Sequence, residues 1–344
     1  MRPGGAGDPG FINVQEARRI KARTPKLSIG PSENQIGECY NPTRHSITSM
    51  KRVTEEQNPS SRDLDLLSTE QVLTLINRED QLVPRWVQHA IPALARAVDD
   101  AAERIRQGGR VFYVGSGTSG RLGVLDAADL PTLFGISPDA FQGVLPGGYG
   151  SCHAETDVSE DDPDLGARDL EARNCQAGDV VVGISASGET PYTRGALAWA
   201  SRAGALTIAI CCNPDCSLSR IADHPIAAVV GPEIIAGSTR LKAATAQKLV
   251  LNMFSTAVMV KLGRVHDNLM INVKMKSAKL KSRGLRILME ASGMTEMQCR
   301  SAMRRSRGDL RVALLILLGG LTEEAAREKL EAHDGNLRKT LESL

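Results

Sequence analysis

Short apolar runs alternate with longer amphipathic stretches through the middle of the chain. The apolar runs lie at residues 111–114, 141–145, 180–184, 206–211 and 226–230, and helical patterns fall between most of them. This alternation predicts parallel strands joined by helices that cover both faces of one α/β sheet. The run at 180–184 reads VVVGI, which is typical of a strand buried on both faces.

Two helical patterns precede the first strand. Ser68 and Gln71 have the spacing of a capping box, so one helix is expected to begin directly after Ser68. The second pattern extends from about residue 86 to residue 106. Pro84 suits the beginning of this helix, and Pro92 predicts a kink or a break in it.

The first and third predicted strands each end in a loop rich in glycine and hydroxyl residues. The first loop is GSGTSG (residues 115–120), and the second loop is SASGET (residues 185–190). Ligands of open α/β sheets bind at the carboxyl ends of strands, and a helix N-terminus offers free N–H groups to an anion. Either these hydroxyls only cap their helices, or the two loops hold a phosphate-bearing ligand between them. The candidate contacts are Gly117, Thr118, Ser119, Ser185, Ser187, Gly188 and Thr190.

The first loop also fits the GxGxxG pattern of dinucleotide-binding sites. Such sites need an acidic residue at the end of the second strand, where it binds the ribose hydroxyls. Here the second apolar run is followed by Pro146, Gly147 and Gly148, and Asp139 precedes it. The sequence therefore favours a sugar phosphate over a nicotinamide dinucleotide.

A long buried helix is predicted over residues 240–261, with residues 237–239 as its cap. Arg240 and Lys242 would then lie in its first turn, where the helix dipole disfavours cations. Either an anionic partner lies nearby, or both side chains are solvated. Beyond residue 285, short amphipathic stretches are interrupted by glycines, which predicts a small helical domain.

Composition narrows the possible partners and the compartment. The formal net charge is +2 and aromatic residues make up 3%, which argues against a nucleic-acid partner. The absence of an apolar run of about 18 residues argues against a membrane span. We see no secretory segment at the start, and the seven cysteines are scattered, so a reduced, cytoplasmic protein is expected. Cys212 and Cys216 lack a matching second pair, so no metal is expected.

Residues 1–49 differ from the rest of the chain. They combine glycine, proline and scattered basic residues with no sustained period. We expect either a disordered arm or a stretch that precedes a natural start at Met50.

Several long stretches carry a family resemblance. In chain order they read TEEQNPSSRDLD, GSGTSGRLGVLDAADLP, GG…SEDD, VVVGISASGETPY, CNP and GSTRLKAATAQKLVLNM. Together they resemble sugar isomerase (SIS) domains, and more closely the N-acetylmuramic acid 6-phosphate etherases, over roughly residues 54–344. The glucokinase regulatory protein, which senses sugar phosphates without catalysis, is a more distant relative with the same loops.

The resemblance implies an architecture and an activity. A helical segment (50–108) would precede a flavodoxin-like SIS core (109–275), and a UBA-like helical domain (276–344) would follow. The protein would be a homodimer with its sites near the subunit interface. It would be a lyase without metal or cofactor that removes the D-lactyl ether of an amino-sugar phosphate, giving N-acetylglucosamine 6-phosphate and D-lactate.

The resemblance also implies two catalytic carboxylates. The family's base is the Glu of a GAED-like stretch, which here reads VSED and supplies Glu160. It would remove the acidic C2 proton of the open-chain aldehyde and then activate water. The family's acid is a Glu in an AAECPPT-like stretch, which here reads AADLPT and supplies Asp129. Glu160 also belongs to an acidic run, which is usually a solvated surface.

The departures from the family pattern leave three interpretations open. Asp129 is one methylene shorter than Glu, Leu130 replaces the family's Cys, and residues 272–280 depart from a DVxPTNxKL-like run. A displacement of about 1 Å at a catalytic group costs roughly a hundredfold in rate. The chain is therefore an etherase with an Asp acid, a SIS enzyme with another substrate such as an isomerase, or a non-catalytic sugar-phosphate sensor.

Overall fold

The computed structural model describes residues 52–152, 160–275 and 277–344. Residues 50–344 belong to one compact unit. The predictions for residues 1–49 and for a start at Met50 fall outside the described residues.

The helical segment before the first strand is divided into short pieces. Ser68 and Gln71 form the predicted capping box at the start of α2. A 3-10 turn separates α3 from α4, and Pro92 stands in the first turn of α4, so the proline marks a break and not a kink. The elements are η3 (Val53–Glu55), η4 (Pro59–Ser61), η5 (Leu64–Leu66), α2 (Thr69–Asp80), α3 (Val83–Val87), η6 (Gln88–Ala90) and α4 (Ile91–Arg106).

Five parallel strands form the sheet in the order β2-β1-β3-β4-β5. This is the flavodoxin order, so the predicted flavodoxin-like core is confirmed. The strands are β1 (Val111–Gly115), β2 (Phe141–Val144), β3 (Val180–Ile184), β4 (Leu206–Cys211) and β5 (His224–Ala227).

The fifth strand begins earlier than the prediction of 226–230. The carboxylate of Asp223 accepts hydrogen bonds from the N–H and hydroxyl of Thr207, at 2.9 and 2.8 Å. This contact sets the register, in which His224 pairs with Ile208. Pro225 is tolerated because β5 lies at the edge of the sheet.

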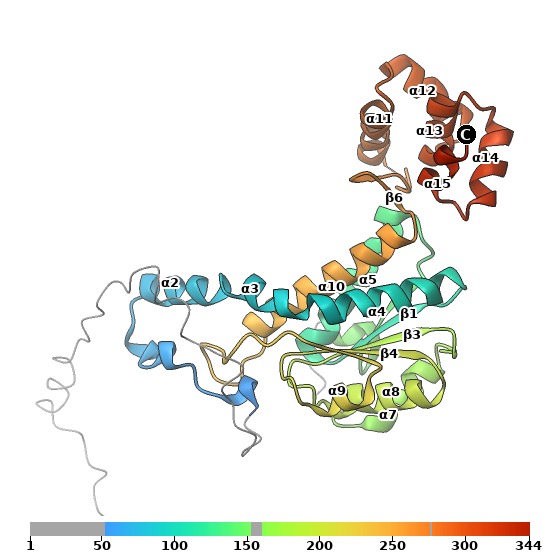
Figure 1. Cartoon of the computed structure of the whole chain (residues 1–344). Coiled ribbons are helices and arrows are strands. Elements are labelled where there is room, and N and C mark those ends of the chain that lie inside the picture. The colour runs from blue at the N-terminus through green and yellow to red at the C-terminus, as the bar shows by residue number, and fades with distance from the viewer. Residues whose placement is uncertain (1–51, 153–159, 276) are drawn as a thin grey trace, which may run out of the picture. The chain divides into compact units, whose positions relative to one another are not determined.

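Helices cover both faces of the sheet, as Figure 1 shows. Successive strand residues point to opposite faces, so Tyr113 and Val182 pack in one apolar core while Phe112 and Val181 pack in the other. The first core includes α4, α5 (Gly117–Phe134) and α10 (Lys242–Lys261), and the second includes α7 (Pro163–Glu171), α8 (Pro191–Arg202) and α9 (Ser217–Ile221). Burial on both faces explains the unbroken apolar runs.

Helix α10 begins two residues later than predicted, and its predicted cap is wrong. No side-chain cap comes from residues 237–239; instead the buried carboxylate of Glu233 accepts the N–H groups of Lys242 and Ala243, at 3.0 and 2.9 Å. Burial raises the pKa of Glu233, although these two N–H donors act in the opposite direction. A carboxylate suits this position because it satisfies free N–H groups and complements the helix dipole.

The C-terminal helices have an apolar core of their own. The glycine interruptions fall between helices as predicted, and Gly293 and Gly320 end α11 and α13 in the left-handed conformation. The elements are a hairpin of β6 (Val265–His266) and β7 (Leu269–Met270), then α11 (Ala278–Ser292), α12 (Glu296–Arg305), α13 (Leu310–Gly319), α14 (Glu323–Ala332) and α15 (Leu337–Glu342). The domain boundaries stay predictions. Within the described ranges, every helix is too short or too polar to cross a membrane.

Candidate active site

The two hydroxyl-rich loops leave the sheet at neighbouring points. Strands β1 and β3 pair directly, and their last residues, Gly115 and Ile184, lie opposite one another. The helix after β1 packs on one face of the sheet and the helix after β3 packs on the other (Figure 1). In a flavodoxin-like sheet this pair of strands is the topological switch point, where ligands bind in the crevice. The structure therefore brings the first and second loops together, as predicted.

The first loop delivers its hydroxyls to the beginning of α5. Gly117 opens the helix with a positive φ of 51°, and Thr118 and Ser119 follow in the first turn, half-buried. The Ser119 hydroxyl donates to Oε1 of Gln247 on α10, at 2.9 Å. Free N–H groups at this helix end suit an anion.

Gln247 is a residue of this site that the sequence analysis did not single out. Its side chain is fully buried, and its Nε2 has no hydrogen-bond partner among the described residues. An unpaired buried amide costs about 1–3 kcal/mol, so such a group in a candidate site is a candidate for ligand contact. The available signal was an amide in the middle of an otherwise apolar helix face.

The second loop forms a closely bonded hydroxyl cluster. The Ser185 hydroxyl lies 2.8 Å from Oγ1 of Thr190 and 3.3 Å from Oγ of Ser187. The N–H groups of Gly188 and Glu189 donate to the Ser185 and Ser187 hydroxyls, at 3.1 and 3.2 Å. These hydroxyls can exchange partners with phosphate oxygens, which accept the same hydrogen bonds.

The hydroxyls at the N-cap positions of α5 and α8 do not cap these helices. Ser116 and Thr190 are the N-cap residues of α5 and α8, and neither side chain makes a capping hydrogen bond within the part of the chain that the structure describes. This favours ligand binding over the capping alternative.

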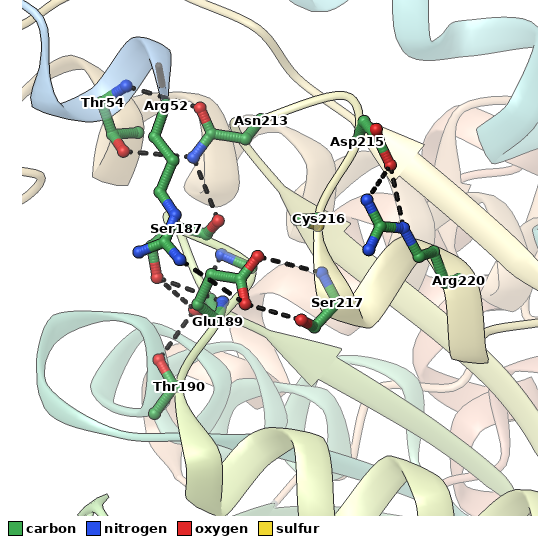
Figure 2. A network of polar contacts seen from close by, with 12 residues as sticks. Arg52, Thr54, Ser187, Glu189, Thr190, Asn213, Asp215, Cys216, Ser217 and Arg220 are labelled. Carbon is green, nitrogen blue, oxygen red and sulfur yellow. Dashed lines mark hydrogen bonds and ion pairs between the residues drawn. The ribbon is translucent and has the colours of Figure 1, made fainter. Parts of the chain in front are cut away.

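Glu189 gives the second loop a carboxylate, but this carboxylate already has protein partners. It accepts from the N–H and hydroxyl of Ser217, at 3.1 and 2.6 Å, and Arg52 lies 3.8 Å away (Figure 2). Burial acts to raise the pKa of Glu189, but the Ser217 hydrogen bonds and the charges of Arg52 and Arg194 outweigh it and hold the pKa below its ordinary value. The charge of Glu189 is thus partly neutralised, so that it would repel an anionic ligand less.

The two predicted cations near α10 differ in their surroundings. Lys242 is buried, and its Nζ lies 2.6 Å from Oε2 of Glu79, which also accepts a hydrogen bond from Asn58. Its anionic partner in this structure is therefore a protein carboxylate. Arg240 is exposed on the turn before α10. Their roles in ligand binding stay predictions.

The two predicted catalytic carboxylates occupy different parts of the fold. Glu160 is exposed in the connection between β2 and α7, directly after residues 153–159, which lie outside the described residues. This connection follows η7 (Gly148–Cys152) and leaves the carboxyl end of β2, beside β1. Glu160 thus comes just before α7, and its place in the candidate site stays a prediction.

Asp129 is exposed on α5, ten residues after Ser119. A helix rises about 1.5 Å per residue, so roughly 15 Å of helix axis separates them. Asp126, three residues earlier, is buried and accepts hydrogen bonds from Tyr113 and Ser255, at 3.0 and 3.2 Å. Burial raises the pKa of Asp126 although both hydrogen bonds oppose this. Asp126 is thus part of the core, and Asp129 lies far from the first loop of its own chain.

No metal cluster is evident in this region. Within residues 52–152, 160–275 and 277–344, His, Cys, Asp and Glu nowhere gather in groups of three that could hold a metal ion.

The fold and the paired loops define a SIS-domain protein. The family model of the glucokinase regulatory protein N-terminal SIS domain matches residues 93–201, and the SIS domain model matches residues 161–257. A solved phosphoheptose isomerase from Francisella tularensis aligns with a TM-score of 0.45 and 16% identity, covering 56% of this chain and 100% of that one. The fold assignment rests on the strand order and not on this alignment.

More similar relatives identify the family within that class. N-acetylmuramic acid 6-phosphate etherases from Yersinia pestis and Yersinia pseudotuberculosis are each 47% identical to this chain over 289 residues, which is 84% of this chain and 98% of theirs. The chain belongs to the N-acetylmuramic acid 6-phosphate etherase family.

Gly117 in the first loop and Gly188 in the second offer a matched test of loop geometry. Both have positive φ, which costs an L-residue about 1–2 kcal/mol. A Cβ at Gly188 would also lie 2.1 Å from Sγ of Cys216, whereas one at Gly117 would meet nothing within 4 Å. We expect Gly188→Ala to lose about 1–3 kcal/mol more unfolding free energy than Gly117→Ala, measured by urea denaturation. Equal losses would contradict the packing described here.

Proposed function

We propose that this chain is a carbon–oxygen lyase that acts on N-acetylmuramic acid 6-phosphate. It would cleave the D-lactyl ether by elimination and add water, giving N-acetylglucosamine 6-phosphate and D-lactate. The observation that carries the proposal is the 47% identity to etherases over 98% of their length. The paired hydroxyl loops at the switch point support it, because they suit the phosphate of an amino sugar. Cytoplasmic amino-sugar catabolism is the setting that this reaction and the free described cysteines favour.

The two loops would bind the phosphate at C6. Thr118 and Ser119 at the beginning of α5, with Ser185, Ser187 and Thr190 across the crevice, supply hydroxyls, and the helix end supplies N–H groups. Gln247 would complete the first loop by orienting Ser119. The sugar ring then extends from the loops, with its reacting C2 and C3 beyond them.

The elimination needs one base and one acid. In the open-chain aldehyde the C2 proton is α to the carbonyl, and Glu160 would remove it. The C3–O bond then breaks, its electron pair leaves with the lactyl oxygen, and Asp129 would protonate that oxygen. The products of this step are an unsaturated aldehyde and D-lactate.

Proton balance in the hydration step indicates that Asp129, and not Glu160, activates the water. After the elimination Glu160 is protonated and Asp129 is a carboxylate. Asp129 is then the group able to take a proton from water as the oxygen adds to C3. The carboxyl proton of Glu160 exchanges with solvent before Glu160 protonates C2. This differs from the sequence-based expectation that Glu160 activates the water, and it restores both groups to their starting states.

We propose that Asp129 acts in the site of a second subunit, and the helix geometry supports this. C3 is three carbons from the phosphorylated C6, so the sugar cannot span the roughly 15 Å between Ser119 and Asp129 of one helix. Leu125, midway along α5, is 50% exposed. A twofold axis beside Leu125 would pair the two α5 helices antiparallel and set Asp129 of the partner subunit level with Arg121, near the first loop. The proposed homodimer would therefore be required for catalysis.

A sugar-phosphate sensor is the second candidate function. The match to the glucokinase regulatory protein SIS domain and the shorter acid Asp129 favour it. Such a protein would bind the sugar phosphate and gain stability from it without releasing D-lactate.

Glu160→Gln tests the base and the function together. Loss of the base is expected to reduce D-lactate release from N-acetylmuramic acid 6-phosphate by about a thousandfold. Binding of N-acetylglucosamine 6-phosphate should remain, because Glu160 lies outside both loops. Asp161→Asn removes the same charge one residue away and should stay close to wild type. Normal turnover by Glu160→Gln would refute the base assignment, and a wild type that binds without releasing lactate would favour the sensor.

Mixing two inactive variants tests the shared site. Glu160→Gln and Asp129→Asn homodimers should each be inactive. In a mixed dimer one site carries both substitutions and the other carries neither. Random assortment after co-expression should therefore restore about a quarter of the wild-type rate. A mixture that stays inactive would place both carboxylates in one subunit, and an active Asp129→Asn homodimer would show that Asp129 is not the acid.

A further inference from the structure

Two sequence stretches remain without a role in the proposed chemistry, and the structure joins them. One is the segment at residues 52–58, here called the strap, which comprises TEEQN and the two residues before it. The other is Asn213 of the CNP stretch, which follows β4. Asn213 lies between the strap and the second loop (Figure 2).

The buried amide of Asn213 uses all of its hydrogen-bonding groups. Its Nδ2 donates to the Ser187 carbonyl oxygen at 3.0 Å and to the Thr54 hydroxyl at 3.1 Å. Its Oδ1 accepts from the Thr54 N–H at 3.4 Å. Asn213 is 3% exposed and Thr54 is 2% exposed. Thr54 thus offers an acceptor and a donor that fix which way the amide faces, so that one Nδ2–H is left for Ser187.

Neighbouring residues hold the next two positions of the second loop. The N–H of Leu218 donates to the Gly188 carbonyl at 3.1 Å, and Ser217 donates twice to the Glu189 carboxylate. Three successive loop residues are therefore held by residues 213–218. The strap contacts two of these positions: Thr54 orients Asn213, and Arg52 lies 3.8 Å from the Glu189 carboxylate.

We propose that Asn213 is a positioning residue for the phosphate site, and that the strap orients it through Thr54. By holding the Ser187 carbonyl, Asn213 fixes the main chain from which the Ser185, Ser187 and Thr190 hydroxyls project. The strap thereby becomes part of ligand recognition without touching the ligand. The identity of the ligand in this proposal rests on the proposed function; the positioning role does not.

Asparagine is required by this geometry. Aspartate has nearly the same shape but lacks both N–H donors, and it would direct a negative charge at the Ser187 carbonyl oxygen. Asn213→Asp should therefore disturb the loop more than its change in volume would suggest. Thr54→Val keeps the backbone N–H and removes only the hydroxyl, so it should have a smaller effect in the same direction.

Thr207 provides a matched control on β4, the strand that Asn213 follows. It lies at the opposite end of β4, is fully buried, and makes a buried polar contact with Asp223. Thr207→Val should lower the melting temperature and leave sugar-phosphate binding within about twofold of wild type. The reason is that its contact lies at the amino end of β4, whereas the loops follow the carboxyl ends of the strands.

The experiment measures KM and kcat for D-lactate release, the Kd for N-acetylglucosamine 6-phosphate, and the melting temperature of each full-length variant. Asn213→Asp should raise KM and Kd about tenfold or more and change kcat much less. Thr54→Val should raise both about threefold. The double variant Thr54→Val/Asn213→Asp should match Asn213→Asp alone, because both changes break one linked contact.

Three results would overturn the proposal. One is an Asn213→Asp protein that loses melting temperature as Thr207→Val does while its KM and Kd stay at wild-type values. Another is full additivity of the two substitutions. The third is a wild type that binds neither N-acetylglucosamine 6-phosphate nor inorganic phosphate. If the wild type releases no lactate but binds the sugar phosphate, the etherase proposal fails while the Kd comparison still tests Asn213.

Discussion

The parallel pairing of β1 with β3 is the constraint on which the candidate site depends. Those strands are separated in sequence by β2 and α7, yet they lie side by side with their carboxyl ends aligned. Because α5 and α8 then pack on opposite faces of the sheet, the two loops leave neighbouring strand ends toward opposite faces, the arrangement in which open α/β sheets bind ligands. A shift of this register would change how the Ser119 hydroxyl of the first loop lies relative to the Ser185 hydroxyl of the second.

The second loop owes its shape to segments distant in sequence. Asn213, Ser217 and Leu218 hold its main chain and its carboxylate, and Thr54 holds Asn213. Residues 212–216 between β4 and α9, together with the first residues of α9, therefore set the shape of this loop. Helix α10 has a similar dependence, since its first N–H groups are satisfied by Glu233. Both arrangements keep polar groups satisfied where burial would otherwise be costly.

Local signals in the sequence predicted the fold well. The apolar runs identified the strands, and the glycine- and hydroxyl-rich turns identified both loops, because strand burial and helix N-termini leave short-range patterns. The errors arose where a distant side chain decided the outcome. Strand β5 begins earlier than predicted because Asp223 accepts hydrogen bonds from Thr207. The first N–H groups of α10 are bound by Glu233 and not by the cap expected at residues 237–239. The role of Asn213 was beyond local reasoning, because its partners lie on other elements. Gln247 left only one local signal, an amide on an otherwise apolar helix face, and its partner Ser119 lies on another helix.

The roughly 15 Å of helix axis between Ser119 and Asp129 is the basis for proposing that a second subunit supplies the catalytic acid. If Asp129 of the partner subunit protonates the lactyl oxygen, the C3–O bond of the sugar breaks and the lactyl oxygen leaves with D-lactate. The most direct measurement is the fate of solvent atoms during turnover of N-acetylmuramic acid 6-phosphate by the wild type. In deuterium oxide, N-acetylglucosamine 6-phosphate should carry deuterium at C2; in water enriched in heavy oxygen, the label should enter the sugar at C3 and be absent from D-lactate. Lactate that carries the heavy oxygen, or no lactate at all, would contradict this account.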